Sequence, residues 1–142
     1  MEKASTPTSA SPHVILLVED ERILLNLYTT TLERAGYTVR TAENVAQALE
    51  AVKDATPDLI LLDLLIPNKT IDPLDFHKRG GFLFFRKIRG DKRFDDTPII
   101  VFTNLDSPDD RKQAKEFRAR DFIVKANYSP KDIIAIVEKE LQ

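Results

Sequence analysis

Cysteine is absent from this chain of 142 residues, and histidine occurs only twice. The absence of cysteine excludes disulfides, thiolate zinc sites and a cysteine nucleophile. No apolar run approaches the ~18 residues of a transmembrane helix, and Met1–His13 lacks the basic start and apolar stretch of a signal peptide. We therefore expect a cytoplasmic protein that does not bind a membrane.

An excess of charge of either sign is also missing. Lys and Arg number 21 against 23 Asp and Glu, for a formal net charge of -2. This balance favours neither a nucleic-acid binder nor a protein with an acidic tail. Basic residues do concentrate in residues 77–93, but we interpret Phe82, Phe85 and Ile88 there as the buried face of a helix whose charges are solvated.

The length of the chain corresponds to one domain. Residues 1–12 are rich in Ser, Thr, Ala and Pro, which predicts a disordered tail, with a cloning remnant as the alternative explanation. Residues 13–142 are expected to form the domain itself.

Within the domain, short apolar runs alternate with amphipathic segments. The apolar runs predict strands at Val14–Val18, Tyr37–Thr41, Leu59–Leu62, Ile99–Phe102 and Phe122–Val124. The other segments predict helices at Ile23–Arg34, Val45–Lys53 and Gly81–Arg89, and after the helix starts Ser107-Pro108 and Ser129-Pro130. Strands that are apolar throughout indicate a parallel sheet covered on both faces, so the predicted fold class is doubly wound α/β. The first helix has apolar positions at helical spacing, at Ile23, Leu24, Leu27, Thr31 and Leu32.

A reactive or charged residue stands just beyond four of the five predicted strands. Ligands of open α/β sheets bind beyond the carboxyl ends of the strands, so these positions are candidates for a site. They are Glu19, Asp20 and Glu21 after the first strand, Asp63 after the third, Thr103 after the fourth and Lys125 after the fifth.

Together these residues have the chemistry of an aspartyl-phosphate site. Carboxylates held close together repel unless a cation joins them, and Mg²⁺ is the usual cation where phosphate is bound as well. In this hypothesis Asp63 attacks phosphorus, while the metal, Lys125 and Thr103 stabilise the phosphoryl oxygens. Acids after a strand often only cap the next helix, and we interpret Glu21 in that way. Asp63 differs, because a carboxylate that follows the apolar run Leu59–Leu62 is costly without partners.

The motifs that carry these residues resemble the receiver domain of two-component response regulators. The similarity extends from about Val14 to Leu141 and rests on ILLVEDE at 15–21, LILLDLLIP at 59–67, PIIVFTN at 98–104 and DFIVK at 121–125. The resemblance implies a flavodoxin-like fold of five βα units with strand order 2-1-3-4-5. It also implies Mg²⁺-dependent phosphorylation by a sensor histidine kinase or a phosphotransfer protein.

The resemblance assigns a role to each candidate residue. Asp63 is the phosphorylated residue, and Asp20 and Asp63 bind Mg²⁺ through their side chains. Leu65 offers the metal its backbone carbonyl, and Glu19 lies near it through water.

The remaining roles concern the phosphoryl group and the output. Thr103 and Lys125 bind the phosphoryl group, and Phe122 is the aromatic switch that turns inward when Thr103 moves. The implied signalling surface consists of the fourth helix, the fifth strand and the fifth helix.

The sequence also departs from the family pattern at several positions. Glu19 stands where Asp is commoner, and Asn104 stands where a small residue is usual, which narrows access to the phosphoryl site. Ala126 replaces the usual proline, so the family's cis peptide is not expected, because a cis bond without proline costs roughly 2.5–4 kcal/mol. Arg118 lies where a glycine often closes the fourth helix.

Two further positions bear on the lifetime of the phosphorylated state. Leu65 and Leu105 occupy the variable positions that tune hydrolysis in this family. Both are apolar and cannot position an attacking water, so we predict a long-lived phosphorylated state.

Residues 68–80 interrupt the regular alternation. Gly81 follows Asp63 by 18 positions, which is longer than the family spacing, so we interpret this segment as an insertion beside the site. We expect it to fold back over Leu83, either as a lid or partner contact or, as we favour, as a loop without a role. A weak candidate for a second metal site lies there as well, at Asp72, Asp75 and His77, and a phosphorelay role for His77 is no stronger.

Three kinds of function compete. The first is a stand-alone receiver that acts through a downstream protein partner, as a monomer or as a homodimer formed on phosphorylation, and that is no enzyme beyond slow autophosphatase activity. The second is a pseudo-receiver, a protein-interaction module without phosphotransfer, which the intact set of site residues argues against. The third is an unrelated enzyme such as a flavin carrier or hydrolase, but GxxxxGK[ST], GxGxxG and a convincing Ser-His-Asp order are all missing.

Overall fold

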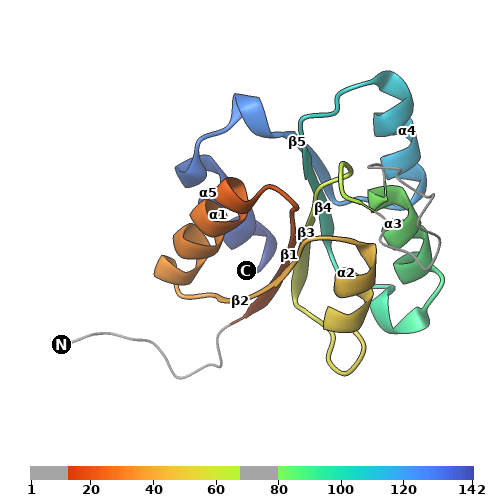
Figure 1. Ribbon diagram of the computed structural model, residues 1–142, viewed down its shortest axis with the longest axis horizontal. Coiled ribbons are helices and arrows are strands. Elements are labelled where there is room, and N and C mark those ends of the chain that lie inside the picture. The colour runs from red at the N-terminus through yellow and green to blue at the C-terminus, as the bar shows by residue number, and fades with distance from the viewer. Residues whose placement is uncertain (1–12, 68–79) are drawn as a thin grey trace.

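The computed structural model describes residues 13–67 and 80–142, in which five strands alternate with five α-helices (Figure 1). The strands are β1 (Val14–Val18), β2 (Thr38–Ala42), β3 (Leu59–Leu62), β4 (Ile99–Thr103) and β5 (Asp121–Val124). The α-helices are α1 (Arg22–Arg34), α2 (Val45–Ala51), α3 (Gly81–Arg89), α4 (Pro108–Glu116) and α5 (Pro130–Glu140). Two short 3₁₀ helices are η1 (Lys92–Phe94) and η2 (Lys125–Asn127).

The strands form one parallel sheet in the order β2-β1-β3-β4-β5, which confirms the predicted architecture. Helices α1 and α5 cover one face of the sheet, and α2, α3 and α4 cover the other (Figure 1). β1 pairs with β2 on one side and with β3 on the other. The strand order therefore reverses between β1 and β3, and an open α/β sheet binds ligands at the carboxyl ends of such strands.

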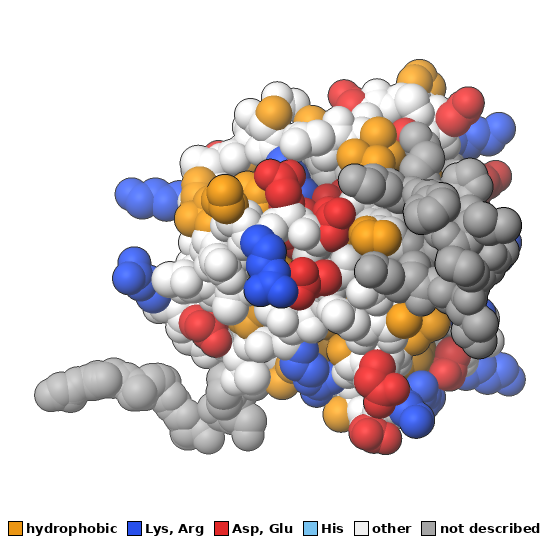
Figure 2. All heavy atoms as spheres, viewed as in Figure 1, with side chains coloured by type: hydrophobic (Ala, Val, Ile, Leu, Met, Phe, Trp, Pro, Cys, Tyr) orange, Lys and Arg blue, Asp and Glu red, His pale blue; other side chains and the backbone are white. Residues whose placement is uncertain are grey.

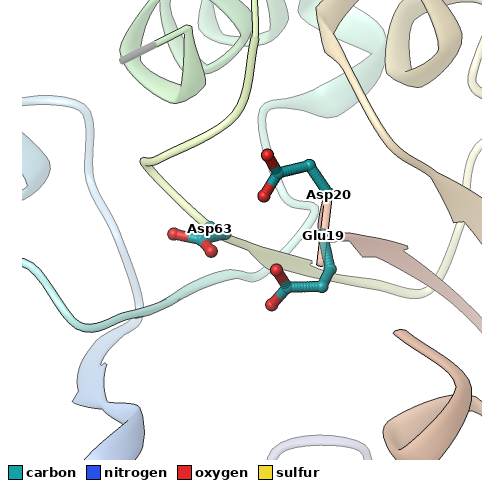
Figure 3. A group of neighbouring side chains, drawn as sticks. All are labelled: Glu19, Asp20 and Asp63. Carbon is teal, nitrogen blue, oxygen red and sulfur yellow. The ribbon is translucent and has the colours of Figure 1, made fainter. Parts of the chain in front are cut away.

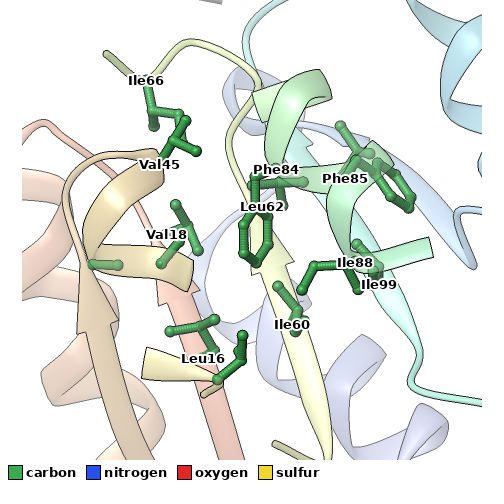
Figure 4. Packing of buried hydrophobic residues seen from close by; sticks show 14 of the residues in the cluster. Leu16, Val18, Val45, Ile60, Leu62, Ile66, Phe84, Phe85, Ile88 and Ile99 are labelled. Atoms are coloured by element: carbon green, nitrogen blue, oxygen red, sulfur yellow. The ribbon is translucent and has the colours of Figure 1, made fainter. Parts of the chain in front are cut away.

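Each face of the sheet has its own hydrophobic core. Because successive side chains of a strand point to opposite faces, β1 and β3 contribute alternate residues to the two cores. The core of Figure 4 contains Leu16, Val18, Ile60 and Leu62, and the opposite core contains Ile15, Leu17, Leu59 and Leu61. Phe84 and Phe85 of α3 fill the first core, and Ile133 and Val137 of α5 fill the second.

The two serine-proline pairs begin helices as predicted. Ser107 accepts the backbone N–H of Asp110 at 3.1 Å, at the start of α4. Ser129 accepts the N–H of Asp132 at 3.2 Å, and the Asp132 carboxylate accepts the N–H of Ser129 at 2.7 Å, which completes a capping box at the start of α5.

The buried face of α1 was predicted incorrectly. Ile23 and Leu27 are 79% and 43% exposed, while the helix buries Leu25, Tyr28 and Leu32. The consecutive apolar residues Ile23, Leu24 and Leu25 lie on different faces of the helix. The spacing of apolar residues therefore could not show which face packs against the sheet. In α3 a smaller error occurs, since Phe82 is only half-buried.

Several boundaries differ from the prediction by one or two residues. β2 begins at Thr38 rather than Tyr37 because it pairs in register with β1, with Val14 opposite Thr38 and Val18 opposite Ala42. α2 ends at Ala51 rather than Lys53. The short helices η1 and η2 were not predicted, since three residues carry no periodic signal.

The interruption between β3 and α3 falls largely outside the described residues. The predicted disordered tail at 1–12 lies outside them too, as do Asp72, Asp75, His77 and the fold-back over Leu83 by residues 68–79. The flanks of this segment are joined, because the N–H of Gly80 donates to the Ile66 carbonyl at 2.8 Å and that of Gly81 donates to the Leu64 carbonyl at 3.3 Å. These two hydrogen bonds hold the start of α3 against the residues after β3, despite the long segment between them.

Within residues 13–67 and 80–142, no helix has the length and apolar character to cross a bilayer.

Candidate functional site

The candidate residues converge at the carboxyl edge of the sheet. Glu19 and Asp20 follow β1, Asp63 follows β3, Thr103 ends β4, and Lys125 follows β5. Because all the strands are parallel, their carboxyl ends lie at the same edge. In Figure 2 acidic side chains gather near the middle of the face on which these strand ends lie.

Glu19, Asp20 and Asp63 form a compact group of carboxylates (Figure 3). One carboxylate oxygen from each lies within 4.8 Å of the other two. Glu19 is 1% exposed and Asp63 is 5% exposed, whereas Asp20 is only partly buried. The group is therefore buried at one end and accessible from solvent at the other.

Asp63 is held by hydrogen bonds on both carboxylate oxygens. Oδ1 accepts the hydroxyl of Thr103 at 2.7 Å and the backbone N–H of Leu65 at 2.9 Å. Oδ2 accepts the ammonium of Lys125 at 2.7 Å. The carboxylate thus has a fixed orientation, with the predicted phosphoryl-binding residues already in contact with it.

Lys125 lies between two carboxylates, because its Nζ donates to Glu19 Oε1 as well as to Asp63. Nζ is also 5.3 Å from the centre of the Phe102 ring. Burial by itself lowers the pKa of Lys125, but the charges and hydrogen bonds of Asp63 and Glu19 outweigh it and raise the pKa above 10.5. Lys125 is therefore charged at neutral pH.

The three carboxylates can each offer one oxygen to a metal ion. Burial raises the pKa of Glu19, and the hydrogen bond and charge of Lys125 only partly oppose this shift. Carboxylate oxygens grouped this closely match a hard divalent cation, and the group fits Mg²⁺.

The structure places the other predicted site residues as follows. Leu65 gives its N–H to Asp63, and the use of its carbonyl for a metal stays a prediction. Phe122 is half-buried in β5, and the Arg111 guanidinium of α4 lies 4.6 Å from its ring centre. Arg111 also pairs with Asp106 at 2.6 Å, so it links the β4–α4 loop to Phe122.

The interpretation of Glu21 as a helix cap is wrong for its side chain. Glu21 is the N-cap residue of α1, but its side chain makes no capping hydrogen bond. Its own N–H donates to Glu19 Oε2 at 3.1 Å, so Glu19 orders the start of the helix while also binding Lys125.

The departures from the family pattern have visible consequences. Arg118 has φ of 62°, the left-handed conformation that glycine adopts at low cost. Among the residues that the structure describes no peptide bond is cis, so the bond between Lys125 and Ala126 is trans. Asn104 accepts the N–H of Ala126 at 3.1 Å, a contact that was not predicted. One signal of this contact was present in the sequence. Asn104 and Ala126 both depart from the family pattern, and each directly follows a site residue.

The basic stretch near α3 includes a residue with an evident structural role. Arg89 donates to the backbone carbonyls of Phe94, Thr97, Phe117 and Arg118. Burial lowers the pKa of Arg89, and nearby Arg118 lowers it further. Arg89 therefore joins α3 to η1, to the residues after η1 and to the residues after α4.

Comparison with known proteins decides the family. The family model described as the response regulator receiver domain matches residues 15–138. The chain belongs to the response regulator receiver family. Its fold and the convergence of polar residues at the carboxyl edge agree with this membership.

Curated relatives of this receiver are longer proteins. The chain is 34% identical over 128 residues to the phosphate regulon transcriptional regulatory protein PhoB of Pseudomonas aeruginosa, covering 90% of this chain and 51% of that protein. It is 36% identical over 128 residues to the transcriptional regulatory protein BaeR of Escherichia coli, covering 90% and 48%. The receiver thus spans about half the length of these relatives.

Solved structures include a similar receiver from a chemotaxis system. The chemotaxis response regulator CheY4 of Vibrio cholerae has a TM-score of 0.77 and 27% sequence identity, covering 92% of this chain and 100% of that one. A signal receiver domain of a signal transduction histidine kinase from Syntrophus aciditrophicus has a TM-score of 0.74 and 28% identity, covering 91% and 89%. Domains of this kind therefore occur in proteins of different organisation.

Proposed function

We propose that this receiver accepts a phosphoryl group on Asp63 from a histidine kinase or a phosphotransfer protein, in a Mg²⁺-dependent reaction. The observation that carries the proposal is the buried Asp63 carboxylate, with Thr103 on one oxygen and Lys125 on the other. A buried carboxylate with two separate donors and two further carboxylates beside it is arranged for phosphoryl chemistry.

The reaction is a displacement at phosphorus. An oxygen of Asp63 forms a bond to phosphorus while the bond from phosphorus to the donor nitrogen or oxygen breaks, and the leaving group departs with the electron pair. Oδ1 accepts two hydrogen bonds and Oδ2 accepts one, so Oδ2 keeps a lone pair for the attack.

During the reaction Lys125 and Thr103 exchange the Asp63 carboxylate for the phosphoryl oxygens as their hydrogen-bond acceptors. The Lys125 ammonium transfers from the Asp63 carboxylate to a phosphoryl oxygen, and the Thr103 hydroxyl does the same on the other side. Asp20, Asp63 and the Leu65 carbonyl would hold Mg²⁺, with Glu19 nearby, and the bound ion would neutralise charge on the phosphoryl group. Glu19 also keeps Lys125 in place through its direct contact.

The output of phosphorylation is a change of the α4-β5-α5 surface. In the phosphorylated protein the Thr103 hydroxyl moves from Asp63 to the phosphoryl group, and Phe122 turns inward in response. Arg111 lies over the Phe122 ring and binds Asp106, so an inward turn of the ring alters α4 as well. A downstream protein partner would recognise this change, with the receiver as monomer or phosphorylation-dependent homodimer.

The test is the intact mass of the protein after incubation with acetyl phosphate and Mg²⁺. A gain of about 80 Da per phosphoryl group is expected in the wild type. The gain is expected to be absent from Asp63→Asn and from a sample with EDTA. Measurable Mg²⁺ binding without any mass gain would contradict the proposal and favour the pseudo-receiver, a protein-interaction module without phosphotransfer.

The phosphorylated state is expected to be long-lived, and the chain is proposed to be a phosphoacceptor rather than an enzyme. Leu65 and Leu105 are both partly buried near Asp63 and Thr103, and neither can hold a water for attack on phosphorus. Following the loss of the added mass after removal of acetyl phosphate measures the lifetime. Rapid loss from the isolated protein would contradict this prediction.

A further inference from the structure

A hydrogen bond at the rim of the site joins the segments that carry Thr103 and Lys125. Asn104 Oδ1 accepts the backbone N–H of Ala126, with 3.1 Å between the two atoms. Asn104 directly follows Thr103, and Ala126 directly follows Lys125. Both Asn104 and Ala126 are exposed, so the contact lies outside the buried site.

The position of this bond is set by the end of the sheet. Thr103 lies opposite Val124 in the last registered pair between β4 and β5. Beyond that pair the chain turns into η2, which begins at Lys125. A side-chain amide oxygen is an acceptor of the same kind as a backbone carbonyl. Asn104 therefore continues the connection between the two segments past the point where the backbone ladder ends.

The bond also closes a ring of contacts around the reacting carboxylate. Asp63 Oδ1 accepts a hydrogen bond from the Thr103 hydroxyl, and Oδ2 accepts one from the Lys125 ammonium, each at 2.7 Å. Asn104 and Ala126 close the outer side of the same ring. The Thr103 hydroxyl is thus fixed relative to the Lys125 ammonium both through Asp63 and through the rim. Once Asp63 gives up these two contacts to a phosphoryl group, the rim bond still connects the two donors.

The hydrogen bond needs the residue types found at both positions. A small apolar residue in place of Asn104 offers no acceptor, and a proline in place of Ala126 offers no N–H. The two departures noted in the sequence are therefore the two halves of one interaction.

We propose that Asn104 is a positioning residue for phosphoryl transfer to Asp63, acting through the N–H of Ala126 to hold Thr103 at a fixed spacing from Lys125. The inference rests on the proposed function. With acetyl phosphate as donor, an Asp63 oxygen bonds to phosphorus while the bond from phosphorus to the acetate oxygen breaks, and acetate leaves with the electron pair. Two donors held at the correct spacing stabilise the transferring group more than two donors that move independently.

The first experiment compares three substitutions of Asn104. Asn104→Ala removes the acceptor and opens space, Asn104→Leu removes the acceptor but keeps the bulk, and Asn104→Asp keeps an acceptor oxygen. Rates of mass gain are measured against acetyl phosphate concentration in the presence of Mg²⁺. Asn127→Ala is a matched control, since it makes the same change to an exposed residue of η2 that has no role in the ring.

The positioning role predicts a specific pattern. Asn104→Ala and Asn104→Leu both lower the maximal rate by about threefold, the effect of one modest hydrogen bond. The concentration for half-maximal rate stays unchanged in these two variants. Asn104→Asp retains the maximal rate, although its charge raises the half-maximal concentration of the anionic donor. If Asn104→Ala reacts faster than the wild type while Asn104→Leu does not, the side chain only restricts access and the inference is wrong.

A second measurement does not depend on phosphorylation. Hydrogen exchange of the Ala126 amide is expected to be about three- to tenfold faster in Asn104→Ala and Asn104→Leu than in the wild type and Asn104→Asp. Equal exchange in all four proteins overturns the inference. A wild type that takes up no phosphate would instead refute the proposed function and the positioning role with it, and the Ala126 amide would still show whether the bond between Asn104 and Ala126 forms.

Discussion

At the scale of single residues, Lys125 carries the electrostatic balance of the buried site. Lys125→Met keeps a long apolar side chain but leaves Glu19 and Asp63 buried without their shared cation. We expect the free energy of unfolding in the absence of Mg²⁺ to fall by about 3 kcal/mol, the usual cost of removing one partner of a buried ion pair. Added Mg²⁺ should recover more stability in this variant than in the wild type.

Urea unfolding with and without Mg²⁺ measures both effects. Lys131→Met is the control, because Lys131 is exposed on α5 and surface substitutions usually change stability by less than about 0.5 kcal/mol. Equal losses in the two variants would show that the buried carboxylates do not require Lys125.

Arg118 is a residue whose backbone conformation suits glycine better than arginine. Its φ of 62° follows the end of α4, and its charge lies close enough to Arg89 to lower the pKa of that residue. We expect Arg118→Gly to raise the free energy of unfolding by about 1 kcal/mol, since the left-handed strain disappears.

The opposite substitution provides the comparison for Arg118. Gly36 has φ of 100°, and an added Cβ there would meet no atom within 4 Å. Gly36→Ala should therefore lose stability from backbone strain alone, by about 1 kcal/mol. If Arg118→Gly also loses stability in urea unfolding, strain at residue 118 is not what limits this turn.

At the scale of elements, the start of α3 packs tightly against the residues after β3, next to the site. A Cβ on Gly81 would lie 2.5 Å from Leu64 Cα and 2.7 Å from the carbonyl oxygen of Asp63. Gly81→Ala must therefore push α3 away from the phosphoacceptor segment. We expect a loss of about 2 kcal/mol in unfolding free energy and slower mass gain with acetyl phosphate.

Gly90 at the other end of α3 is the matched control for this substitution. A Cβ there would lie 3.5 Å from the Arg86 carbonyl oxygen, an ordinary contact. Gly90→Ala should leave the phosphorylation rate unchanged. A Gly81→Ala variant as stable and as reactive as Gly90→Ala would mean that the β3–α3 junction is freely adjustable.

The capping box of α5 predicts a dependence of stability on pH. The N–H and side chain of Ser129 hold the pKa of Asp132 below its usual 3.8. Because the folded pKa is lowered, the charged carboxylate stabilises the folded chain above about pH 3.8, and this contribution disappears as the pH falls through the lowered value. Asp132→Asn should therefore be less stable than the wild type at pH 6, with the difference shrinking toward pH 3.

Urea midpoints of both proteins across this pH range give the measurement. Asp109→Asn in the first turn of α4 is the comparison, since Asp109 takes no part in that helix's serine cap. A wild-type advantage over Asp132→Asn that stays constant with pH would contradict the role of the Asp132 charge.

Most elements of the fold could be predicted because their signals are local. Apolar runs of strand length and serine-proline helix starts identified β1, β3, α4 and α5, and the site residues followed from where the strands end. The buried face of α1 could not be predicted, since Ile23 and Leu27 mark one apolar face and Leu25 and Tyr28 mark another, and only packing against the sheet selects between them. The bond between Asn104 and Ala126 was equally hidden, because it depends on how two loops approach each other.

At the scale of the whole molecule, the site draws on parts of the chain that are far apart. Thr103 and Asp63 are separated by 40 positions, Asp63 and Lys125 by 62, and Glu19 and Lys125 by 106. Together these contacts need β1, β3, β4 and β5 to be paired in their final order. Contacts of such long range form late in folding, after the entropy of closing large loops has been overcome.

The parallel arrangement of the strands therefore ties chemical competence to completed folding. A chain with any one of these four strands detached lacks either the acceptor carboxylate or a partner that stabilises the phosphoryl group. In a population that contains partly folded molecules, acetyl phosphate would then label only those whose sheet is complete. The phosphorylated fraction, measured by mass during unfolding, would then equal the fraction of molecules that are natively folded.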